Sequence, residues 1–421
     1  MSRGSLRIAW LGAGPLQQES GGVPGVATEL LYGLSKLGYE IDCFFAGVER
    51  EVPQRLAAAE NLTFVWGTSR WHWNRWYSRG RLAALVSGLL ARSYASLRVR
   101  REVARRHARA PYDVVYQFSN IETLAMPAAM RRTVPLVIQP ETHMAGELKA
   151  LIAERHLGAR CQPLHTRAIV IAVRLLRTIV QRSRIRRARL LVCISSVFRD
   201  HLVHDYGFPL ERTVVIPNPV RLERFGNLER GLAEPPAILV LGRVAARKGI
   251  EDVIAVARRL HERGIDAHVR IVGGPDLASD YTKLLDELPP ENSEYAGRIP
   301  PSEVPVELMR SDILLQASKY EPFGLTVAEA LAAGVPVVAT DEVGAIEGID
   351  PSVGATVRPG DVEGIVTAIV AMLERLRVEP QATRSLARAE AERRYAPELV
   401  CGEVASALQA LVADETSTSR R

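Results

Sequence analysis

The chain has 421 residues, of which 47% are apolar and 24% are charged. This length exceeds one ordinary domain, and the composition is that of a folded globular protein, which excludes fibrous and disordered classes. The four cysteines are widely spaced and form no Cys-x-x-Cys pair, which argues against structural zinc and fits a reducing cytoplasm. We expect no signal peptide and no transmembrane segment, because Arg174 and Arg177 interrupt the most apolar stretch, residues 168–180.

The net charge of +6 is divided unevenly along the chain. Residues 1–230 contain 34 Lys and Arg against 18 Asp and Glu, whereas the remaining residues contain 20 against 30. A strongly basic first half indicates an anionic partner for that half, such as a membrane, a nucleic acid or an acidic acceptor.

The first half alternates predicted strands with predicted helices. A strand at 6–11 is followed by a helix at 23–37 with apolar residues at helical spacing, and Gly38 ends that helix. Further strands are predicted at 39–45, 62–66, 114–118, 136–139, 190–194 and 214–217. Strands separated by helices predict a parallel, doubly wound sheet.

The glycines after the first strand allow different interpretations. The Gly-Ala-Gly at 12–14 resembles the start of a dinucleotide fingerprint, but Gln17 stands at the third glycine position and no helix begins there. We therefore reject a nicotinamide site. Gly21 and Gly22 immediately precede the helix, and they form either a tight turn or a close approach of the backbone to a ligand.

Two arginine-rich stretches interrupt the alternation. Residues 70–109 hold eleven Arg against one acid, with Trp and Tyr between them, and residues 155–189 hold ten Arg and no acid. The second stretch contains an apolar stripe at helical spacing, formed by Ile169, Val173, Leu176 and Val180. Basic amphipathic helices suit an anionic membrane surface. A solvated helix face is the alternative, and nucleic acid ranks below both because no recognised binding motif accompanies the charge.

Residues 226–236, which end in Pro-Pro, are predicted to link two domains. In the second domain, strands are predicted at 237–241, 269–272, 312–316 and 337–339, and helices at 250–262, 362–375 and 397–413. Arg243 and Lys248 flank the turn between its first strand and first helix. Because positive charge and unpaired N–H groups meet at that helix N-terminus, the turn is predicted to bind an anion.

The stretch 318–336 places two glutamates around a second helix N-terminus. A helix is predicted to begin near Gly324, so the preceding turn would direct backbone N–H groups at an anion. That turn is formed by Phe323, Gly324 and Leu325. Glu321 precedes these donors and Glu329 follows them, so each carboxylate could accept hydrogen bonds from hydroxyls on one side of the anion. A nucleoside diphosphate sugar has this arrangement, with its diphosphate between a ribose and a hexose.

The embedding of the two glutamates resembles a known signature. Glu-Pro-Phe-Gly, an Ala-rich helix with the second Glu, and Ala-Ala-Gly-Val-Pro-Val-Val-Ala-Thr are similar to the Glu-x7-Glu signature of retaining glycosyltransferases of family 4. The resemblance implies the GT-B fold, an α/β architecture in which two Rossmann-like doubly wound domains face each other across a cleft. It places an acceptor-side domain at 1–222, completed by a crossing helix at about 396–413, and a nucleotide-sugar domain at 223–395. Residues 414–421 are expected to form a disordered tail.

The resemblance also implies roles for single residues of the second domain. Arg243 and Lys248 would neutralise the donor diphosphate, whereas Arg247 would be a solvated neighbour. Glu321 would hold hydroxyls of the sugar, and Glu329 would hold those of the ribose. Further donor contacts are implied, many of them through the backbone, at Gly22, Gly242, Gly297, Arg298, Phe323, Gly324 and Leu325.

Two features of the first domain match the family less closely. His143 follows the strand at 136–139 and would face the donor sugar, although it could equally be a plain loop histidine. The family's usual Asn-Gly-Val-Asp turn is here changed, with Pro219 and Arg221 in place of its Gly and Asp. This change removes any role of that acid.

The implied chemistry is transfer of a sugar from a UDP- or GDP-sugar to a hydroxyl, with retention at the anomeric carbon. The acceptor would be a lipid-linked or cell-surface glycan precursor, and the enzyme would lie in the cytoplasm, peripheral to the inner face of the membrane. No Asp-x-Asp occurs, so we expect no metal and no cofactor. The alternatives are a phosphorylase or epimerase of the same fold, or a non-catalytic basic protein that binds membrane or nucleic acid.

Overall fold

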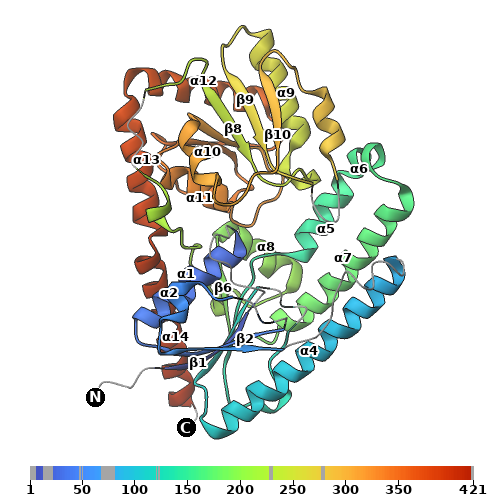
Figure 1. Ribbon diagram of the computed structural model, residues 1–421, viewed down its shortest axis with the longest axis vertical. Coiled ribbons are helices and arrows are strands. Elements are labelled where there is room, and N and C mark those ends of the chain that lie inside the picture. The colour runs from blue at the N-terminus through green and yellow to red at the C-terminus, as the bar shows by residue number, and fades with distance from the viewer. Residues whose placement is uncertain are drawn as a thin grey trace.

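The computed structural model describes residues 6–12, 22–46, 49, 51–67, 81–119, 121, 124–226, 231–275 and 280–418, with the side chains of 81–93, 246 and 418 left out. Figure 1 shows two α/β domains, with the N-terminal domain (blue to green) below the C-terminal domain (yellow to orange). A long red segment at the C-terminal end of the chain runs along both domains.

The N-terminal domain contains a parallel sheet of seven strands in the order β3-β2-β1-β4-β5-β6-β7. The strands are β1 (Arg7–Gly12), β2 (Glu40–Phe45), β3 (Leu62–Trp66), β4 (Val114–Phe118), β5 (Leu136–Gln139), β6 (Leu190–Cys193) and β7 (Thr213–Val215). The central strand β1 is buried along its length, as expected for a strand covered by helices on both faces. The predicted doubly wound sheet is confirmed, and the predicted strands differ from the observed ones by at most two residues at an end.

Seven helices of the N-terminal domain are described, and they connect successive strands. They are α1 (Val23–Lys36), α2 (Gln54–Ala57), α4 (Arg81–Arg109), α5 (Met144–Ala153), α6 (Arg155–Cys161), α7 (Leu164–Ile185) and α8 (Ser196–Tyr206). Ser195 caps α8, because its hydroxyl accepts the backbone N–H of Phe198.

The C-terminal domain contains a parallel sheet of six strands in the order β10-β9-β8-β11-β12-β13. The strands are β8 (Ala237–Leu241), β9 (His268–Val272), β10 (Ser293–Gly297), β11 (Ile313–Gln316), β12 (Val337–Thr340) and β13 (Gly354–Val357). The helices are α9 (Ile250–Glu262), α10 (Val304–Arg310), α11 (Leu325–Ala332), α12 (Val362–Val378), α13 (Pro380–Tyr395) and α14 (Pro397–Thr418). β10, β13, α10 and α13 were not predicted from the sequence.

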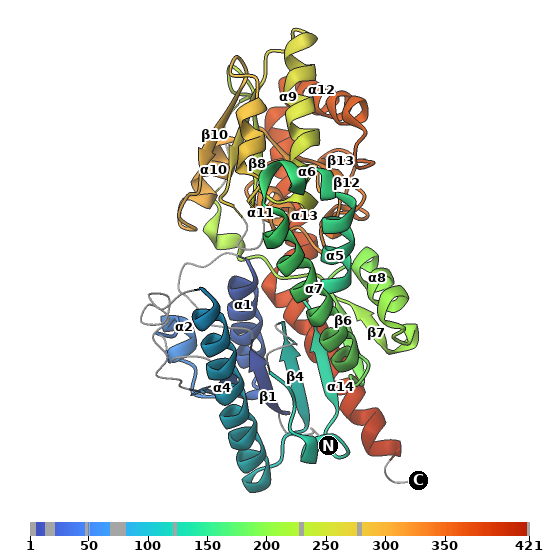
Figure 2. The same ribbon diagram turned by 90° about the vertical axis from the view of Figure 1, so that its right-hand side faces the viewer.

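The final helix α14 returns to the N-terminal domain and packs against α1 (Figures 1 and 2). Val400, Cys401 and Val404 belong to the same hydrophobic core as the first strand. The prediction of a disordered tail from residue 414 is wrong as far as Thr418, because α14 continues to that residue. Glu415 forms an ion pair with Arg189, which holds this last turn on the domain. Residues 419–421 lie outside the described residues.

Within the described residues, one helical stretch, Pro380–Ser417, is long and apolar enough to cross a membrane. The test selects this stretch rather than residues 168–180, which were expected to be the most apolar. The core helix of a soluble protein passes the same test, and this stretch covers two helices that meet at Ala396 and contribute Tyr395 and Val400 to the hydrophobic core.

The two arginine-rich stretches contain long helices at the side of the N-terminal domain (Figure 1). Residues 70–80 and the side chains of 81–93 lie outside the described part, so only the end of α4 can be compared with the first stretch. In the second stretch, the predicted apolar stripe lies on α7 and faces outward. Ile169 is 58% exposed, Val173 45% and Leu176 63%.

Candidate active site

The candidate site lies at the carboxyl ends of the strands of the C-terminal sheet, where the strand order reverses. β8 and β11 are neighbours in this sheet, although β9 and β10 lie between them in the chain. Loops that leave such a pair of strands diverge and form a crevice, which is the usual ligand site of open α/β sheets. The two loops here are residues 242–249 after β8 and 317–324 after β11.

Gly249 brings these two loops into contact. Its φ of +65° lies in the left-handed region, and a Cβ at this position would stand 1.9 Å from the carbonyl oxygen of Ala317. Only glycine allows this approach without strain. As a result, the end of the first loop, with Arg247 and Lys248, lies against the residues that precede Glu321.

Glu321 forms ion pairs with two cationic side chains of the first loop. Its Oε2 lies 2.5 Å from Nζ of Lys248 and 2.6 Å from Nη1 of Arg247. Arg247 also accepts the backbone N–H of Lys319 at 2.8 Å, which ties the loops together through the main chain. The prediction that Arg247 is a solvated neighbour is wrong, because the contact of the two loops turns its guanidinium toward Glu321.

Burial and charge act in opposite directions on this ion pair. Burial would raise the pKa of the Glu321 carboxyl, but Lys248 and Arg247 outweigh it and lower that pKa to about 2. Burial lowers the pKa of Lys248, Glu321 raises it, and the neighbouring Arg247 and Arg243 lower it further, with a net fall. Arg243 therefore lies near enough to add to the positive charge, and its own side chain is exposed. Two cations pair with one carboxylate and a third cation lies near Lys248, so positive charge is in excess and the site attracts an anion.

The N-terminus of α11 completes the positive side of the crevice. Gly324 caps this helix with a φ of +90°, and a Cβ there would stand 2.6 Å from Cγ1 of Val343. The helix begins at Leu325, as predicted, so its first N–H groups have no partner within the helix. Phe323 is 4% exposed and packs edge-on against Tyr395, so this residue can contact a ligand only through its backbone.

Glu329 lies on the second turn of α11, buried beside Arg224. Its Oε1 is 3.5 Å from Nη1 of Arg224, in a short turn (Leu222–Arg224) at the end of the first domain. Burial raises the pKa of Glu329 to about 7, although Arg224 acts to lower it. Near neutral pH this carboxyl is therefore divided between its protonated and ionised forms.

The remaining predicted donor-binding residues of the C-terminal domain lie at the ends of neighbouring strands. Gly242 follows β8, and a Cβ there would stand 3.7 Å from Nζ of Lys248. Gly297 ends β10, and its carbonyl accepts the backbone N–H of Gly273 at 2.8 Å. Arg298 is exposed and lies along Gly274. The structure thus gathers these residues at the carboxyl edge that also carries Lys248.

Gly22 lies across the domain boundary, at the start of α1. This helix begins at the end of the N-terminal domain that faces the C-terminal domain (Figures 1 and 2). The φ of Gly22 is +69°, and a Cβ there would meet nothing within 4 Å, so its position is open. Residues 13–21, which include Gly21, lie outside the described residues.

His143 does not face an open site. Its side chain is fully buried, with Nδ1 2.9 Å from the hydroxyl of Tyr320 and Nε2 3.3 Å from Oδ2 of Asp205. Burial lowers the pKa of His143 to about 3, against the opposing effect of Asp205. The prediction that this histidine faces the donor sugar is not met in this conformation, because Tyr320 covers the ring.

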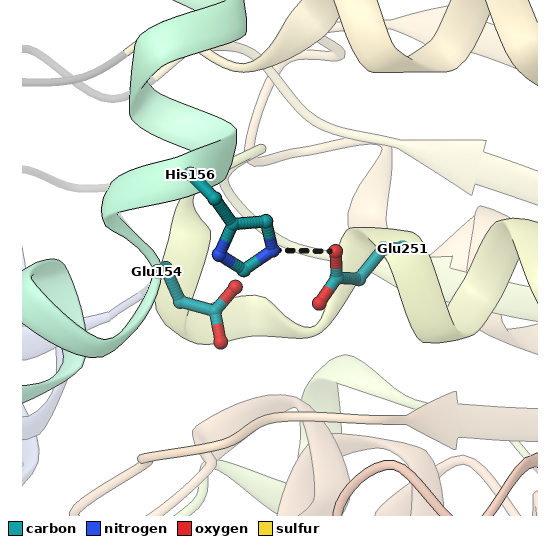
Figure 3. A group of neighbouring side chains, drawn as sticks. All are labelled: Glu154, His156 and Glu251. Carbon is teal, nitrogen blue, oxygen red and sulfur yellow. Dashed lines mark hydrogen bonds and ion pairs between the residues drawn. The ribbon is translucent and has the colours of Figure 1, made fainter.

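A second group of residues meets where the domains join. Figure 3 shows Glu154, His156 and Glu251, whose potential ligand atoms all lie within 4.8 Å of one another, a spacing that could hold a metal ion. Nζ of Lys319 lies 2.9 Å from Glu154 and 2.6 Å from Glu251. A metal ion would have to displace this ammonium, so the group is explained as an ion-pair network between the domains.

Two family models match this chain. The model described as "Glycosyltransferase Family 4" matches residues 20–224, and the model described as "Glycosyl transferases group 1" matches residues 229–385. The chain belongs to glycosyltransferase family 4. The match to a curated relative, the glycogen synthase of Mycobacterium tuberculosis, is 29% identical over 215 residues and covers 50% of each chain. The chain thus spans about half the length of that glycosyltransferase.

Solved structures confirm the fold of this glycosyltransferase. The sucrose-phosphate synthase of Thermosynechococcus elongatus aligns with a TM-score of 0.65 and 17% identity, over 97% of this chain and 100% of that one. The Anabaena protein HepE in complex with UDP aligns with a TM-score of 0.62 and 18% identity, over 96% and 100%. At this level of identity the likeness establishes the predicted GT-B architecture and nothing finer.

Three residues of the glycosyltransferase site were missed by the sequence analysis. Arg247 was assigned to solvent, and neither Arg224 nor Tyr320 was considered. Only the Arg-x-x-x-Arg-Lys spacing of residues 243–248 could have pointed to Arg247. Nothing in the sequence marks the other two, because their partners lie on other elements and, for Tyr320, in the other domain.

Proposed function

We propose that this protein is a retaining glycosyltransferase that moves a sugar from a UDP- or GDP-sugar to a hydroxyl acceptor. The observation that carries the proposal is the pairing of Lys248 and Arg247 with Glu321, three residues before the N-cap of α11, with Arg243 near Lys248. Membership of family 4 supports transfer of a sugar, and the UDP complex of the structural neighbour supports a nucleotide donor.

The cations and the helix N-terminus would bind the donor diphosphate. Cleavage of the glycosyl–phosphate bond leaves negative charge on the departing diphosphate, and fixed donors stabilise that charge without reorganising. Arg243 and Lys248 would supply charge, and the N–H groups of Gly324 and Leu325 would supply neutral donors. By analogy with the loss of an oxyanion-hole donor, removal of one such cation should raise the barrier by about 2.7–4 kcal/mol.

Glu321 would change partners when the donor binds. Without an anion, its carboxylate balances Lys248 and Arg247. The diphosphate would draw these cations toward itself, and the carboxylate would then accept hydrogen bonds from hydroxyls of the sugar. A pKa of about 2 keeps Glu321 ionised, so it acts as an acceptor rather than as a proton donor.

Glu329 would hold the ribose, and Gly297 with Arg298 would line the place of the nucleobase. A carboxylate accepts both hydroxyls of a ribose, and Glu329 is buried on the second turn of α11, whereas Glu321 precedes the helix. Gly22 would approach the diphosphate from the N-terminal domain. His143 would then position Tyr320 rather than touch the sugar, because its ring is covered.

The transfer itself would proceed on one face of the sugar. The acceptor oxygen forms the new bond to the anomeric carbon as the bond to the diphosphate breaks, and the leaving phosphate oxygen takes the acceptor's proton. The configuration is thereby retained. We propose that no metal takes part, because the sequence has no Asp-x-Asp and three cationic side chains stand at the anion site.

Calorimetric titration with UDP and with GDP, each without metal, tests the donor site. Binding of one nucleotide identifies the donor class, and binding of neither contradicts the proposal. Lys248→Ala should abolish transfer with the fold intact, whereas Lys283→Ala, a control on the same domain, should leave transfer unchanged. Wild-type transfer by Lys248→Ala would contradict the assignment. An NMR spectrum of the first product shows whether the anomeric configuration is retained.

We further propose that α7 holds the enzyme on an anionic membrane and that the acceptor is a lipid-linked or cell-surface glycan precursor. The stripe of Ile169, Val173 and Leu176 is exposed on a helix that carries several arginines and no acid. Such a helix lies in the membrane interface with its apolar face inserted. In a flotation assay at low salt, the protein should move to the top fraction with phosphatidylglycerol vesicles. The double variant Ile169→Ser/Leu176→Ser should remain in the bottom fraction. Equal flotation of both would assign the stripe to a solvated face.

A further inference from the structure

An arginine-lined cavity lies in the N-terminal domain, at the edge of the sheet opposite the candidate active site. Its volume is about 980 Å³. It is lined where β5 begins at Leu136, by Arg189 just before β6 and Arg212 just before β7, and by Val412 and Glu415 near the end of α14. Figure 2 shows that the C-terminus of the chain lies at the end of the N-terminal domain that is far from the C-terminal domain. The cavity lies at this end, since residues near the end of α14 line it.

The lining of this cavity is strongly cationic. Among the described residues, two of the lining side chains are carboxylates, those of Asp113 and Glu415. Seven are guanidinium groups, those of Arg131, Arg132, Arg184, Arg186, Arg187, Arg189 and Arg212. Asp113 accepts the backbone N–H of Arg7 at 2.7 Å, and Glu415 pairs with Arg189, which is one of the seven. Two carboxylates cannot balance seven guanidinium groups, so the lining keeps a net positive charge.

Two of the arginines are held in place by the fold. Arg184 donates from Nη1 to the carbonyl oxygens of Ile121 and Leu124, the latter at 2.8 Å. Arg212 lies over the ring of Phe208 at 5.0 Å and donates to the carbonyl of Ala188. Its Nε is buried and has no hydrogen-bond partner among the described residues. Backbone and ring contacts therefore hold both guanidinium groups in place.

The other cavity arginines have free capacity. In the part of the chain that the structure describes, Arg131, Arg132 and Arg186 have no carboxylate partner, and Arg187 donates to the hydroxyl of Ser183 at 3.3 Å. Their planar groups suit the oxygen pairs of phosphate, which arginine binds bidentately. Met126, Val134 and Val412 give the same cavity an apolar part.

We propose that this cavity is a second binding site, for a ligand that carries two or more phosphate groups. One phosphate cannot satisfy several guanidinium groups that come from three separate segments (131–132, 184–189 and 212), whereas a diphosphate or triphosphate can. The volume lies within the usual range of small-molecule sites. Because the cavity and the donor crevice lie at opposite edges of the structure, both can be occupied at once.

Titration of inorganic triphosphate into the Lys248→Ala protein tests this site without the main cation of the donor crevice. The test variant adds Arg131→Gln/Arg186→Gln, and a charge-matched control adds Arg101→Gln/Arg109→Gln on α4. All four side chains are exposed, so each variant should melt as its parent does. Relative to the Lys248→Ala parent, we expect the affinity for triphosphate to fall about tenfold for each cavity arginine removed. In the control variant it should fall by less than about threefold. Equal affinity in all three proteins would overturn the proposal.

Vesicles distinguish the two sources of such phosphates. If vesicles that contain a lipid with a diphosphate headgroup bind the parent protein, and if both the cavity variant and added triphosphate abolish that binding, the ligand is a lipid headgroup. If the cavity variant loses triphosphate but binds vesicles like the parent, the ligand is a soluble polyphosphate.

Discussion

The hydroxyl of Tyr320 lies 2.9 Å from Nδ1 of His143, so the residue beside Glu321 is anchored in the opposite domain. On the other side of Glu321, the carbonyl oxygen of Pro322 accepts a hydrogen bond from the Ser195 hydroxyl, with 2.8 Å between the two oxygens. Gly146 provides the space for the phenol, because a Cβ there would stand 2.4 Å from the Tyr320 ring. The loop that carries the proposed sugar-binding carboxylate is thus held between two contacts to the N-terminal domain.

Tyr320→Phe should loosen this loop. The change leaves buried Nδ1 of His143 without its partner, which should lower the free energy of unfolding by about 1–3 kcal/mol. It should also lower kcat more than it raises KM, because Glu321 loses a fixed position. Tyr281→Phe is the matched control, because the buried Tyr281 hydroxyl has no hydrogen-bond partner within the described chain. Urea unfolding and steady-state kinetics measure both effects, and equal behaviour of the two variants would contradict the anchoring role.

Glu321→Gln should separate nucleotide binding from transfer. The amide no longer competes with the diphosphate for Lys248 and Arg247, so UDP or GDP should bind at least as tightly as before. Transfer should fall about 10²–10³-fold, as for loss of a transition-state contact. Calorimetry and a transfer assay measure the two quantities. Glu291→Gln, an exposed site of the same domain, serves as control. Weaker nucleotide binding by Glu321→Gln would contradict the exchange of partners.

Glu329 should make stability fall as the pH rises toward neutrality. Burial raises its pKa from 4.5 to about 7, so the folded chain binds this proton more tightly than the unfolded chain does. The stabilisation is complete below pH 4.5 and is lost by about pH 7, and the shift corresponds to about 3 kcal/mol at most. Glu329→Gln should remove this part of the fall in urea unfolding between pH 5 and 7. Burial also raises the pKa of Glu141 to about 7, so Glu141 would account for the fall in stability that remains in the variant. An unchanged slope in the variant would contradict the burial of Glu329.

Arg384→Ala should destabilise the C-terminal domain strongly. Arg384 lies 2.7 Å from Asp312, and the two side chains are 1% and 0% exposed. Asp312 also accepts the backbone N–H groups of Ala233 and Ala237, which fixes the start of β8. Removing the arginine leaves a buried charge and should cost about 3–5 kcal/mol.

The exposed pair of Arg377 and Glu374 provides the comparison for that change. The two residues lie on adjacent turns of α12, and their side chains are 49% and 59% exposed. Arg377→Ala should therefore lower the free energy of unfolding by less than about 1 kcal/mol. Urea unfolding measures both variants. Similar losses in the two would show that the Asp312 pair is hydrated rather than buried.

Local patterns predicted most of the architecture. Most of the strands, the two helix N-termini at Gly249 and Gly324, and the places of Lys248 and Glu321 follow from hydrophobic periodicity, glycine positions and short motifs within one segment. α13 was missed because its apolar residues are few and its buried contacts include Arg384, which sequence reasoning assigns to the surface.

The tertiary structure decided which side chains meet. Arg247 and Arg243 are similar residues of one loop, and only the contact of Gly249 with Ala317 turns Arg247 toward Glu321. His143 is buried rather than open because Tyr320 arrives from the other domain. The sequence determined the elements, since each depends on residues a few positions apart. Burial, pKa and ion-pair partners depend on groups brought together only when loops of different strands and domains close on one another.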